Sequence, residues 1–272
     1  MPDDAISDLH RTAIAAAALR AAHAIAGAEP KIFCDDLALA LSGLSREEVL
    51  ALAARVPAAS AATCILRSRF AEDGLAASGP GQYVVLGAGL DSFGLRLAGR
   101  ADDPQVYEVD DPAFQRWKRR RIAAAGLGVP QGLHFVPCDF ETDALDAALA
   151  RAGFDAGAAA FVSLLGVTQY LTRPAIRATL AWAGARPHGS RIVLSYLEAN
   201  RESEALAAAM AGGGVAVPSR FAVAEMTALL REAGFTCIDH LDPAMAQATY
   251  FARRSDGLCV PGMQRLVAAA IV

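Results

Sequence analysis

The sequence predicts an α/β protein with a doubly wound, mostly parallel sheet of seven strands and a helical segment ahead of it. Two observations support this fold class. A short apolar run, Tyr83–Leu86, ends in the glycine-rich turn Gly87-Ala88-Gly89, and such a strand-to-turn step is typical of the ligand-binding corner of these sheets. Beyond the turn, strand-like and helix-like stretches alternate, which favours parallel strands with helices on both faces.

Residues 1–78 are expected to be helical and to form a cap over the sheet. Alanine dominates Ile6–Ala26, and Ser45 and Glu48 have the spacing of a helix-starting capping box. A helical layer that only packs on the sheet is the alternative to a cap. The remaining elements of this part are helices at Asp35–Leu41 and Ala59–Leu75 and a linker at Ser78-Gly79-Pro80-Gly81.

Residues 79–272 are expected to form the core, with a helical insertion near 199–217. A helix is also expected to begin directly after the glycine turn. The predicted strands are Tyr83–Leu86, Gln105–Val109, His134–Pro137, Ala158–Leu164, Gly189–Tyr196, Thr236–Leu241 and Ala248–Ala252. The other predicted helices are Ala113–Ala125, Ala144–Ala152, Ile176–Ala185, Ala199–Met210 and Val223–Ala233.

The residues after the glycine turn narrow the ligand class. A dinucleotide site has the pattern G-x-G-x-x-G, in which the third glycine lets helix and strand come close together. Here that position is Ser92, and Gly94 comes two residues later. Gly87 and Gly89 still allow the backbone to approach a ligand. A nicotinamide-dependent oxidoreductase therefore remains an alternative, although the third glycine of its usual pattern is missing here.

Acidic residues follow the second and third predicted strands, where ligands of such sheets bind. A carboxylate about twenty residues beyond the turn accepts the ribose hydroxyls of a nucleoside. Glu108 and Asp110 both fit, and Asp110 is preferred because it lies nearer the end of the strand. Asp139, followed by Phe140, suits the amino group and face of an adenine. The alternative is that Asp111 and Asp139 only start or cap helices.

Composition argues against nucleic-acid-binding, disulfide-rich and metal-binding proteins. The formal net charge of −4 argues against a nucleic-acid partner. The only dense basic run, Lys118-Arg119-Arg120-Arg121, is interpreted as the solvated face of a helix. The five cysteines are odd in number and contain no C-x-x-C pair, so neither a disulfide framework nor a metal site is expected.

Nothing in the sequence suggests export or a membrane. Asp3, Asp4 and Asp8, with Arg11 further along, make the N-terminus unlike a signal peptide. The longest uncharged stretch, Ala156–Thr172, is shorter than the ~20 apolar residues of a membrane span. We therefore expect a soluble, cytoplasmic protein without a membrane partner. Its oligomeric state stays open.

These motifs together resemble one family. The chain is similar to the leucine carboxyl methyltransferase-like branch of the class I S-adenosylmethionine-dependent methyltransferases, which includes many bacterial polyketide-type O-methyltransferases. The resemblance implies a Rossmann-like methyltransferase sheet and S-adenosylmethionine as cofactor. It is found in Ile65–Phe70, Val85–Ser92, Tyr107–Pro112, Trp117-Lys118, Val136–Glu141, Gly166–Thr172 and Gly189–Arg191.

The resemblance also implies roles for individual residues. Arg67 resembles the arginine that pairs with the methionine carboxylate of the cofactor, for which a guanidinium fork is well suited. Arg20 is a weaker candidate for a second contact to that carboxylate. The other residues assigned to the cofactor are Gly87, Ala88 and Gly89 along its methionine and ribose, Glu108 or Asp110 at the ribose, and Asp139 and Phe140 at the adenine.

One position departs from the family pattern. The family usually has a glutamate just before the glycine that follows the fourth strand, and this chain has Leu165 there. A side-chain contact of that acid with the cofactor is therefore lost, and a contact through the backbone of Leu165 stays open. Leu165 motivates an alternative, in which the protein binds the nucleoside but no longer transfers methyl and has a binding or cyclase-like role.

The predicted reaction is methyl transfer from S-adenosylmethionine to a carboxylate or hydroxyl oxygen of a small molecule, in secondary-metabolite biosynthesis. Such a reaction depends mainly on alignment of the reacting atoms and exclusion of water. A carboxylate acceptor is already ionised near neutral pH, whereas a hydroxyl needs a general base. No catalytic residue is identified, and Tyr170, Tyr196 and His240 are the candidates for lining the acceptor pocket.

Overall fold

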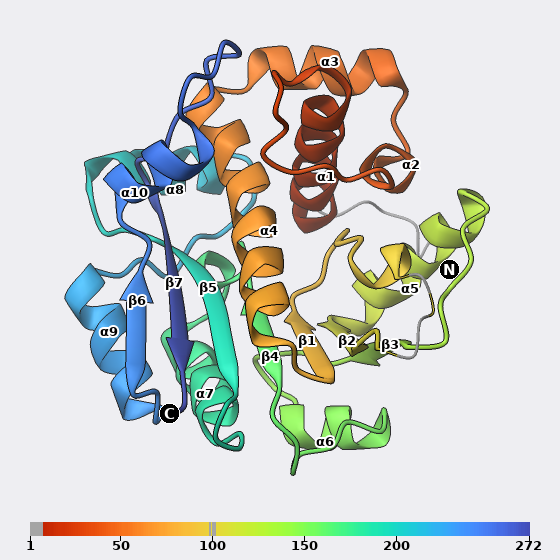
Figure 1. The fold of residues 1–272 in the computed structure, drawn as a ribbon. Coiled ribbons are helices and arrows are strands. Elements are labelled where there is room, and N and C mark those ends of the chain that lie inside the picture. Colours follow the sequence, from red (N-terminus) through yellow and green to blue (C-terminus); the bar gives the residue numbers. More distant parts are fainter. Residues whose placement is uncertain (1–7, 98, 100–101) are drawn as a thin grey trace.

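A computed structural model describes residues 8–97, 99 and 102–272 (Figure 1). The predicted acids Asp3 and Asp4 and the predicted start of the first helix at Ile6 lie outside these residues. Seven strands form one sheet in the order β3-β2-β1-β4-β5-β7-β6. They are β1 (Gln82–Leu86), β2 (Gln105–Asp110), β3 (Leu133–Pro137), β4 (Phe161–Leu164), β5 (Arg191–Leu197), β6 (Cys237–His240) and β7 (Gln264–Ala270).

The sheet is mostly parallel, which confirms the predicted fold class. β1 lies at its centre and pairs in parallel with β2 and β4. Only β7 runs against its neighbours, between β5 and β6. The parallel strands therefore bring their carboxyl ends to one edge, which we call the upper edge, and the loops that follow β1, β2, β3 and β4 all begin there.

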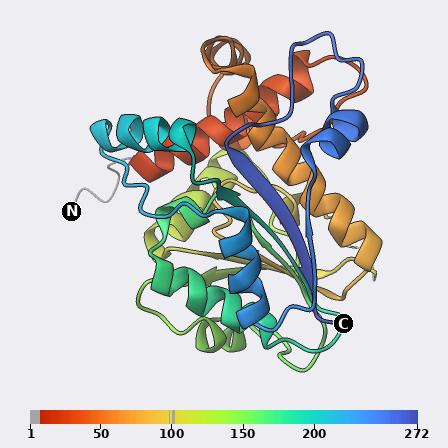
Figure 2. The ribbon, with the colours of Figure 1, turned by 90° about the vertical axis from the view of Figure 1, so that its left-hand side faces the viewer.

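Helices cover both faces of the sheet (Figures 1 and 2). On one face, Tyr83 and Val85 pack against residues of α4 and α5 such as Leu75 and Ile122. On the other face, the apolar residues of the sheet pack with those of α6, α7 and α9. These helices are α4 (Ala58–Ser78), α5 (Pro112–Ala124), α6 (Leu145–Arg151), α7 (Arg173–Gly184) and α9 (Val223–Glu232).

Three further helices lie above the upper edge, at the top of Figure 1. They are α1 (Asp8–Ala26), α2 (Ala38–Ser42) and α3 (Arg46–Arg55), and we call them the helical cap. Small residues such as Ala18 and Ala21 let α1 pack closely with its neighbours around Val49. The predicted capping box starts α3, because Ser45 Oγ accepts from the Glu48 amide and the Glu48 carboxylate accepts from the Ser45 amide.

The prediction of a last strand at Ala248–Ala252 is wrong. That stretch lies at the end of α10 (Pro243–Tyr250) and in the turn after it. Asp242 caps this helix by accepting from two backbone amides, and Pro243 stands at its first position, so the local signals favour a helix. The seventh strand is β7, which follows Pro261 and Gly262 and was not predicted.

The helix expected directly after the glycine turn is also absent from the described residues. Only the single 3-10 turn η1 (Gly94–Arg96) forms there. Gly94 lies against Leu133, since a β-carbon on it would come within 2.5 Å of the Leu133 side chain. The predicted insertion after β5 is helical and forms α8 (Arg201–Gly212).

Within the described part of the chain, no single helix is long and apolar enough to cross a membrane. The pair α3 and α4 satisfies the length and composition criteria only when taken together, and it is bent by 118° between Arg55 and Ala58. Residues of α4 such as Ala71 and Leu75 are buried against the sheet.

Candidate functional site

The glycine turn after β1 has the backbone shape that its sequence predicts. Gly87 and Gly89 have φ angles of +68° and +50°, in the left-handed region that favours glycine. A β-carbon on Gly87 would lie 2.2 Å from the side chain of Val167, so the turn packs closely against the loop after β4. At Gly89 the nearest atom to such a β-carbon is Cβ of Ala13, at 3.8 Å, and the cap therefore lies directly over the turn.

Asp110 is joined to this turn from the end of β2. Its Oδ2 atom accepts a 2.7 Å hydrogen bond from the Gly89 amide, and Oδ1 accepts from the Asp111 amide. Burial raises the pKa of Asp110 to about 6, and the two backbone donors act against this rise. The carboxylate is half-buried at the upper edge, where it can accept further hydrogen bonds.

Glu108, two residues earlier, is fully buried beneath Asp110. Its Oε2 atom lies 2.5 Å from Nζ of Lys118, which is 1% exposed. Burial raises the pKa of Glu108 to about 7, and the neighbouring ammonium group opposes this rise. The prediction of a solvated basic face is therefore wrong for Lys118, although Arg119 and Arg120 are exposed. The structure gives Glu108 an internal partner and leaves Asp110 nearer the surface.

Arg67 reaches the same edge from α4. A β-carbon on Gly166 would lie 2.2 Å from its Nη1 atom, so the guanidinium group packs on the backbone just after β4. Arg67 is half-buried, and among the described residues its side chain has no hydrogen-bond or ion-pair partner. Leu165, at the position of the family's acid, packs into the apolar core beside α4.

Asp139 and Phe140 lie at the end of β3, next to Asp110. The Cys138 amide donates to the Asp110 carbonyl, which brings the two strand ends together. Oδ1 of Asp139 accepts from the Glu141 amide and shapes a turn, while the half-buried Phe140 packs against the core. Asp111 caps α5, as its alternative interpretation proposes.

The sequence-predicted residues thus form one chain of contacts along the upper edge. Arg67 contacts Gly166, and the next residue, Val167, contacts Gly87. Two residues further on, Gly89 is hydrogen-bonded to Asp110. The arrangement places a cation with no partner among the described residues, a glycine turn and a half-buried carboxylate along one edge, which suits a nucleoside with an acidic tail.

The Arg20 side chain hydrogen-bonds to other residues of the protein. Its Nε atom donates to Asp35 at 2.8 Å, and Nη2 donates to the Leu90 carbonyl at 2.6 Å. Asp35 also accepts from Ser92 Oγ at 2.7 Å. Ser92, at the third-glycine position, therefore anchors the turn to the cap, which explains why a hydroxyl-bearing residue stands there.

The three candidates for the acceptor pocket differ in burial. Tyr196 is fully buried, and its hydroxyl is 3.2 Å from Nδ1 of His240. The other ring nitrogen of His240 is 2.8 Å from Thr227 Oγ1, which itself donates to the Val223 carbonyl. Burial lowers the pKa of His240. Tyr196 and His240 are therefore engaged with each other, whereas Tyr170 is half-buried in η2 (Thr168–Tyr170) at the upper edge.

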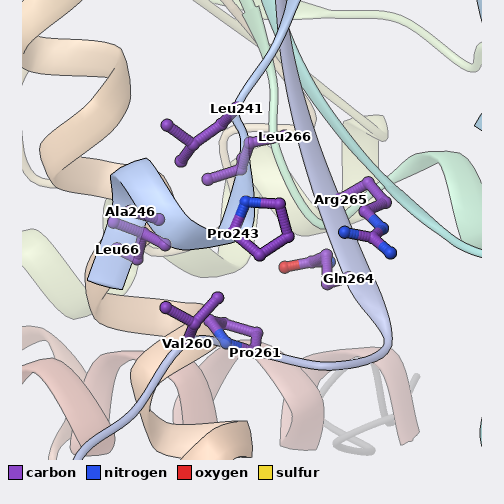
Figure 3. A pocket seen from close by; sticks show the side chains of 9 residues that line it. All are labelled: Leu66, Leu241, Pro243, Ala246, Val260, Pro261, Gln264, Arg265 and Leu266. Atoms are coloured by element: carbon purple, nitrogen blue, oxygen red, sulfur yellow. The ribbon is translucent and has the colours of Figure 1, made fainter. Parts of the chain in front are cut away.

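A small hollow lies beside this edge, between α4, α10 and β7 (Figure 3). Its walls are apolar, and Gln264 and Arg265 are the polar residues beside it. Arg265 is paired with Glu198 at 2.7 Å. A second hollow lies at the opposite end of the sheet, around Gln105 and Gly132.

Sequence reasoning missed the internal roles of Arg20, Ser92 and Lys118. For Lys118 a signal was present, because Phe114, Lys118 and Ile122 recur every four residues and share the buried face of α5. The charge of Lys118 obscured this pattern. The roles of Arg20 and Ser92 depend on contacts between segments far apart in the chain, which no local pattern shows.

The chain is similar to proteins that carry a provisional methyltransferase name. A YktD protein of Bacillus subtilis, which carries the provisional name of S-adenosyl-L-methionine-dependent methyltransferase, is 34% identical over 189 residues, or 66% of this chain and 62% of that protein. A Mycobacterium tuberculosis protein with the same provisional name is 41% identical over 96 residues, or 35% of this chain and 30% of that protein. The matched part thus spans about three-fifths of YktD and less than a third of the mycobacterial protein.

Solved structures share the fold. A protein of Thermobifida fusca provisionally named as a methyltransferase superposes with a TM-score of 0.58 at 17% identity, over 93% of this chain and 94% of that one. The methyltransferase SibL in its apo form gives 0.51 at 18% identity, over 85% and 60%. A model of the leucine carboxyl methyltransferase family matches residues 13–184, well over half of the sequence and the whole upper edge from Arg20 to Tyr170. The chain belongs to the leucine carboxyl methyltransferase family.

Proposed function

We propose that this protein is an S-adenosylmethionine-dependent methyltransferase that methylates an oxygen of a small molecule. The observation that carries the proposal is Arg67, a half-buried guanidinium group without a partner among the described residues, placed beside the glycine turn. An arginine in such a position matches a ligand carboxylate. The family assignment and the provisional names of the relatives support the coarser part of the proposal, methyl transfer that depends on S-adenosylmethionine.

The residues at the upper edge fit this cofactor. Asp110 is available to accept the ribose hydroxyls while it holds the Gly89 amide. Asp139 and Phe140 frame the adenine, and Arg67 binds the carboxylate of the methionine part. When bound, S-adenosylmethionine supplies a methyl group on a sulfonium. The sulfur leaves as a neutral thioether and needs no protonation. The protein's task is then to orient the two reactants and exclude water.

The acceptor we favour is a carboxylate. The Tyr196 hydroxyl lies 3.2 Å from Nδ1 of His240, and Thr227 takes the other ring nitrogen, so both side chains are engaged inside the protein; burial also lowers the pKa of His240. A carboxylate needs no base, because it is ionised near neutral pH. A hydroxyl acceptor would need a base, for which these two residues are poorly placed. A role in secondary metabolism and a location in the cytoplasm belong to the same proposal.

Calorimetric titration of the protein with S-adenosylmethionine, S-adenosylhomocysteine and NAD tests the proposal. We expect both sulfur-containing nucleosides to bind and NAD not to bind. Binding of NAD alone would contradict the proposal. Methyl transfer is then assayed against a panel of carboxylic acids and alcohols. Cofactor binding with no transfer to any member would favour the alternative that Leu165 motivates, a protein that binds the nucleoside without turnover.

A further inference from the structure

Two buried cations hold the carbonyl groups of the two residues that directly follow the glycine turn, Leu90 and Asp91. Nη2 of Arg20 donates to the Leu90 carbonyl at 2.6 Å, and Nζ of Lys118 donates to the Asp91 carbonyl at 2.7 Å. Arg20 comes from the cap and Lys118 from α5, so two different elements hold the segment after the turn. Leu90 follows directly after Gly89, whose amide is bonded to Asp110.

Each cation has its own buried acid. Arg20 is paired with Asp35 at 2.8 Å, and Lys118 with Glu108 at 2.5 Å. All four side chains are under 10% exposed. Burying such pairs is costly, and apolar residues of similar size often stabilise a fold as well or better. Core stability alone is therefore a poor reason for two charged pairs beside one turn.

The Glu108–Lys118 pair is also incompletely satisfied. Within the part of the chain that the structure describes, the buried Oε1 of Glu108 has no hydrogen-bond partner, and Gln115 donates to the Glu108 backbone carbonyl instead. A pair present only for stability would be expected to satisfy both carboxylate oxygens. Lys118 instead directs a donor to the Asp91 carbonyl, and this contact fixes the turn relative to β2 and α5.

We propose that Lys118 and Arg20 are positioning residues for the cofactor: they fix the carbonyls of Asp91 and Leu90 and thereby orient the turn from Gly87 to Gly89 toward the nucleoside. This inference rests on the proposed function. Arg20 acts on the turn through Nη2 and is held by Asp35 through Nε, while Nζ of Lys118 is shared between the Asp91 carbonyl and Glu108. Because Arg20 belongs to α1, docking of the cap and the shape of the turn are coupled.

The test compares S-adenosylhomocysteine affinity with fold stability in two variants. Lys118→Met removes the contact to Asp91 and leaves Glu108 buried without its cation. The double variant E108L/K118M replaces the pair by apolar residues of similar size, which removes that penalty. We expect the double variant to recover the wild-type melting temperature, yet to bind S-adenosylhomocysteine about tenfold more weakly, the effect of a lost hydrogen bond from a charged donor.

The Gly89 amide provides a second readout. We expect its ¹⁵N NMR signal to move in E108L/K118M, because the turn is no longer fixed at Asp91, while amides of the distant strand β6 stay in place. Arg116→Met is the matched control, since Arg116 is an exposed cation on the same helix. We expect it to preserve both affinity and the Gly89 signal.

The outcomes separate this inference from the proposed function. If wild-type protein fails to bind S-adenosylhomocysteine, the proposed function fails. If wild-type protein binds and E108L/K118M is folded, binds equally well and keeps the Gly89 signal, Lys118 is only structural and the inference is overturned. If the double variant does not fold, Arg20→Met and Arg20→Met/Asp35→Leu take its place and remove the contact to the Leu90 carbonyl. Weaker S-adenosylhomocysteine binding with a moved Gly89 signal then supports the inference, and wild-type affinity with an unmoved signal overturns it.

Discussion

The guanidinium group of Arg67 packs on the backbone of Gly166, where a β-carbon would lie only 2.2 Å from Nη1. This contact connects a helix that precedes the sheet with the loop after β4. Gly166 also has a φ angle of +72° and donates its amide to Ser195 Oγ at 2.7 Å. The loop that supports Arg67 is thus itself fixed from β5.

Gly166→Ala is expected to displace Arg67 and weaken binding of S-adenosylhomocysteine by about tenfold, which corresponds to loss of part of a charged hydrogen bond. Titration calorimetry measures the change. Gly257→Ala is the matched control, because Gly257 has a φ angle of +73° and open space around a β-carbon. Both variants carry the same backbone strain, so equal affinities in the two would contradict a role for the Arg67–Gly166 contact.

Arg67→Ala is expected to weaken binding of the cofactor by about 2–4 kcal/mol, because the ligand carboxylate then lies in a partly buried site without its cation. The exposed Arg46 on α3 supplies the control variant Arg46→Ala, which is expected to bind as the wild type does. Unchanged affinity in Arg67→Ala would show that the methionine carboxylate binds elsewhere.

Asp110→Asn is expected to weaken S-adenosylhomocysteine binding by about 1.5–3 kcal/mol and to change its pH dependence. The ribose hydroxyls need the ionised carboxylate, and burial raises the pKa of Asp110 to about 6. Wild-type affinity should therefore be constant above about pH 6 and fall as the pH drops through that value.

The Asn variant should lack this fall in affinity at acid pH. Asp155→Asn, at the opposite end of the sheet, is the control, since its side chain accepts from the Gly157 amide in the same way. A wild-type affinity that stays level through about pH 6 would mean that Asp110 does not bind the nucleoside.

Ser92→Gly restores the third glycine of the dinucleotide pattern but is expected to give no NAD binding. The substitution removes the hydrogen bond to Asp35 and the 3.1 Å bond from Arg96. Unfolding free energy should fall by about 2 kcal/mol, because buried charged groups lose a partner. Denaturant unfolding measures this, with Ser60→Gly on the first turn of α4 as a comparison. Stability equal to wild type would contradict the anchoring role of Ser92.

His23 is expected to make the cap sensitive to acid. Burial lowers the pKa of His23 to about 4, and Nε2 accepts from the Ile32 amide. Because the folded pKa lies below the unfolded value of 6.5, the stabilisation is complete above about pH 6.5 and is lost as the pH falls through about 4. The contribution is up to about 3 kcal/mol.

Unfolding free energies of wild type and His23→Gln over this pH range check the prediction. Glutamine does not titrate and can still accept from the Ile32 amide. Its stability should therefore fall less steeply with acid than that of the wild type. Identical slopes would show that His23 does not carry the acid sensitivity.

The sequence was sufficient where local patterns determine structure. The apolar run at Tyr83–Leu86 and the glycines after it predict β1 and its turn, because glycine adopts the positive φ angles found there far more readily than residues with a side chain. The capping pair Ser45 and Glu48 fixes the start of α3 in the same way. Asp110 could be placed at the upper edge because side chains alternate along a strand.

The sequence was insufficient where structure depends on distant contacts. β7 was missed because the apolar alternation of Gln264–Ala270 is weak and its place between β5 and β6 is set by pairing. The predicted strand at Ala248–Ala252 is wrong because Asp242 and Pro243 start a helix whose last turn overlaps this stretch. Lys118 was misinterpreted for the same physical reason, since burial of a cation depends on a carboxylate and a carbonyl from other segments.

A crystal structure with S-adenosylhomocysteine tests the central claim most directly. The account predicts the ribose hydroxyls on the Asp110 carboxylate, the amino-acid carboxylate on Arg67, and the adenine beside Asp139 and Phe140. A nucleoside bound away from the glycine turn, or bound there with Asp110 and Arg67 both out of contact, would contradict it.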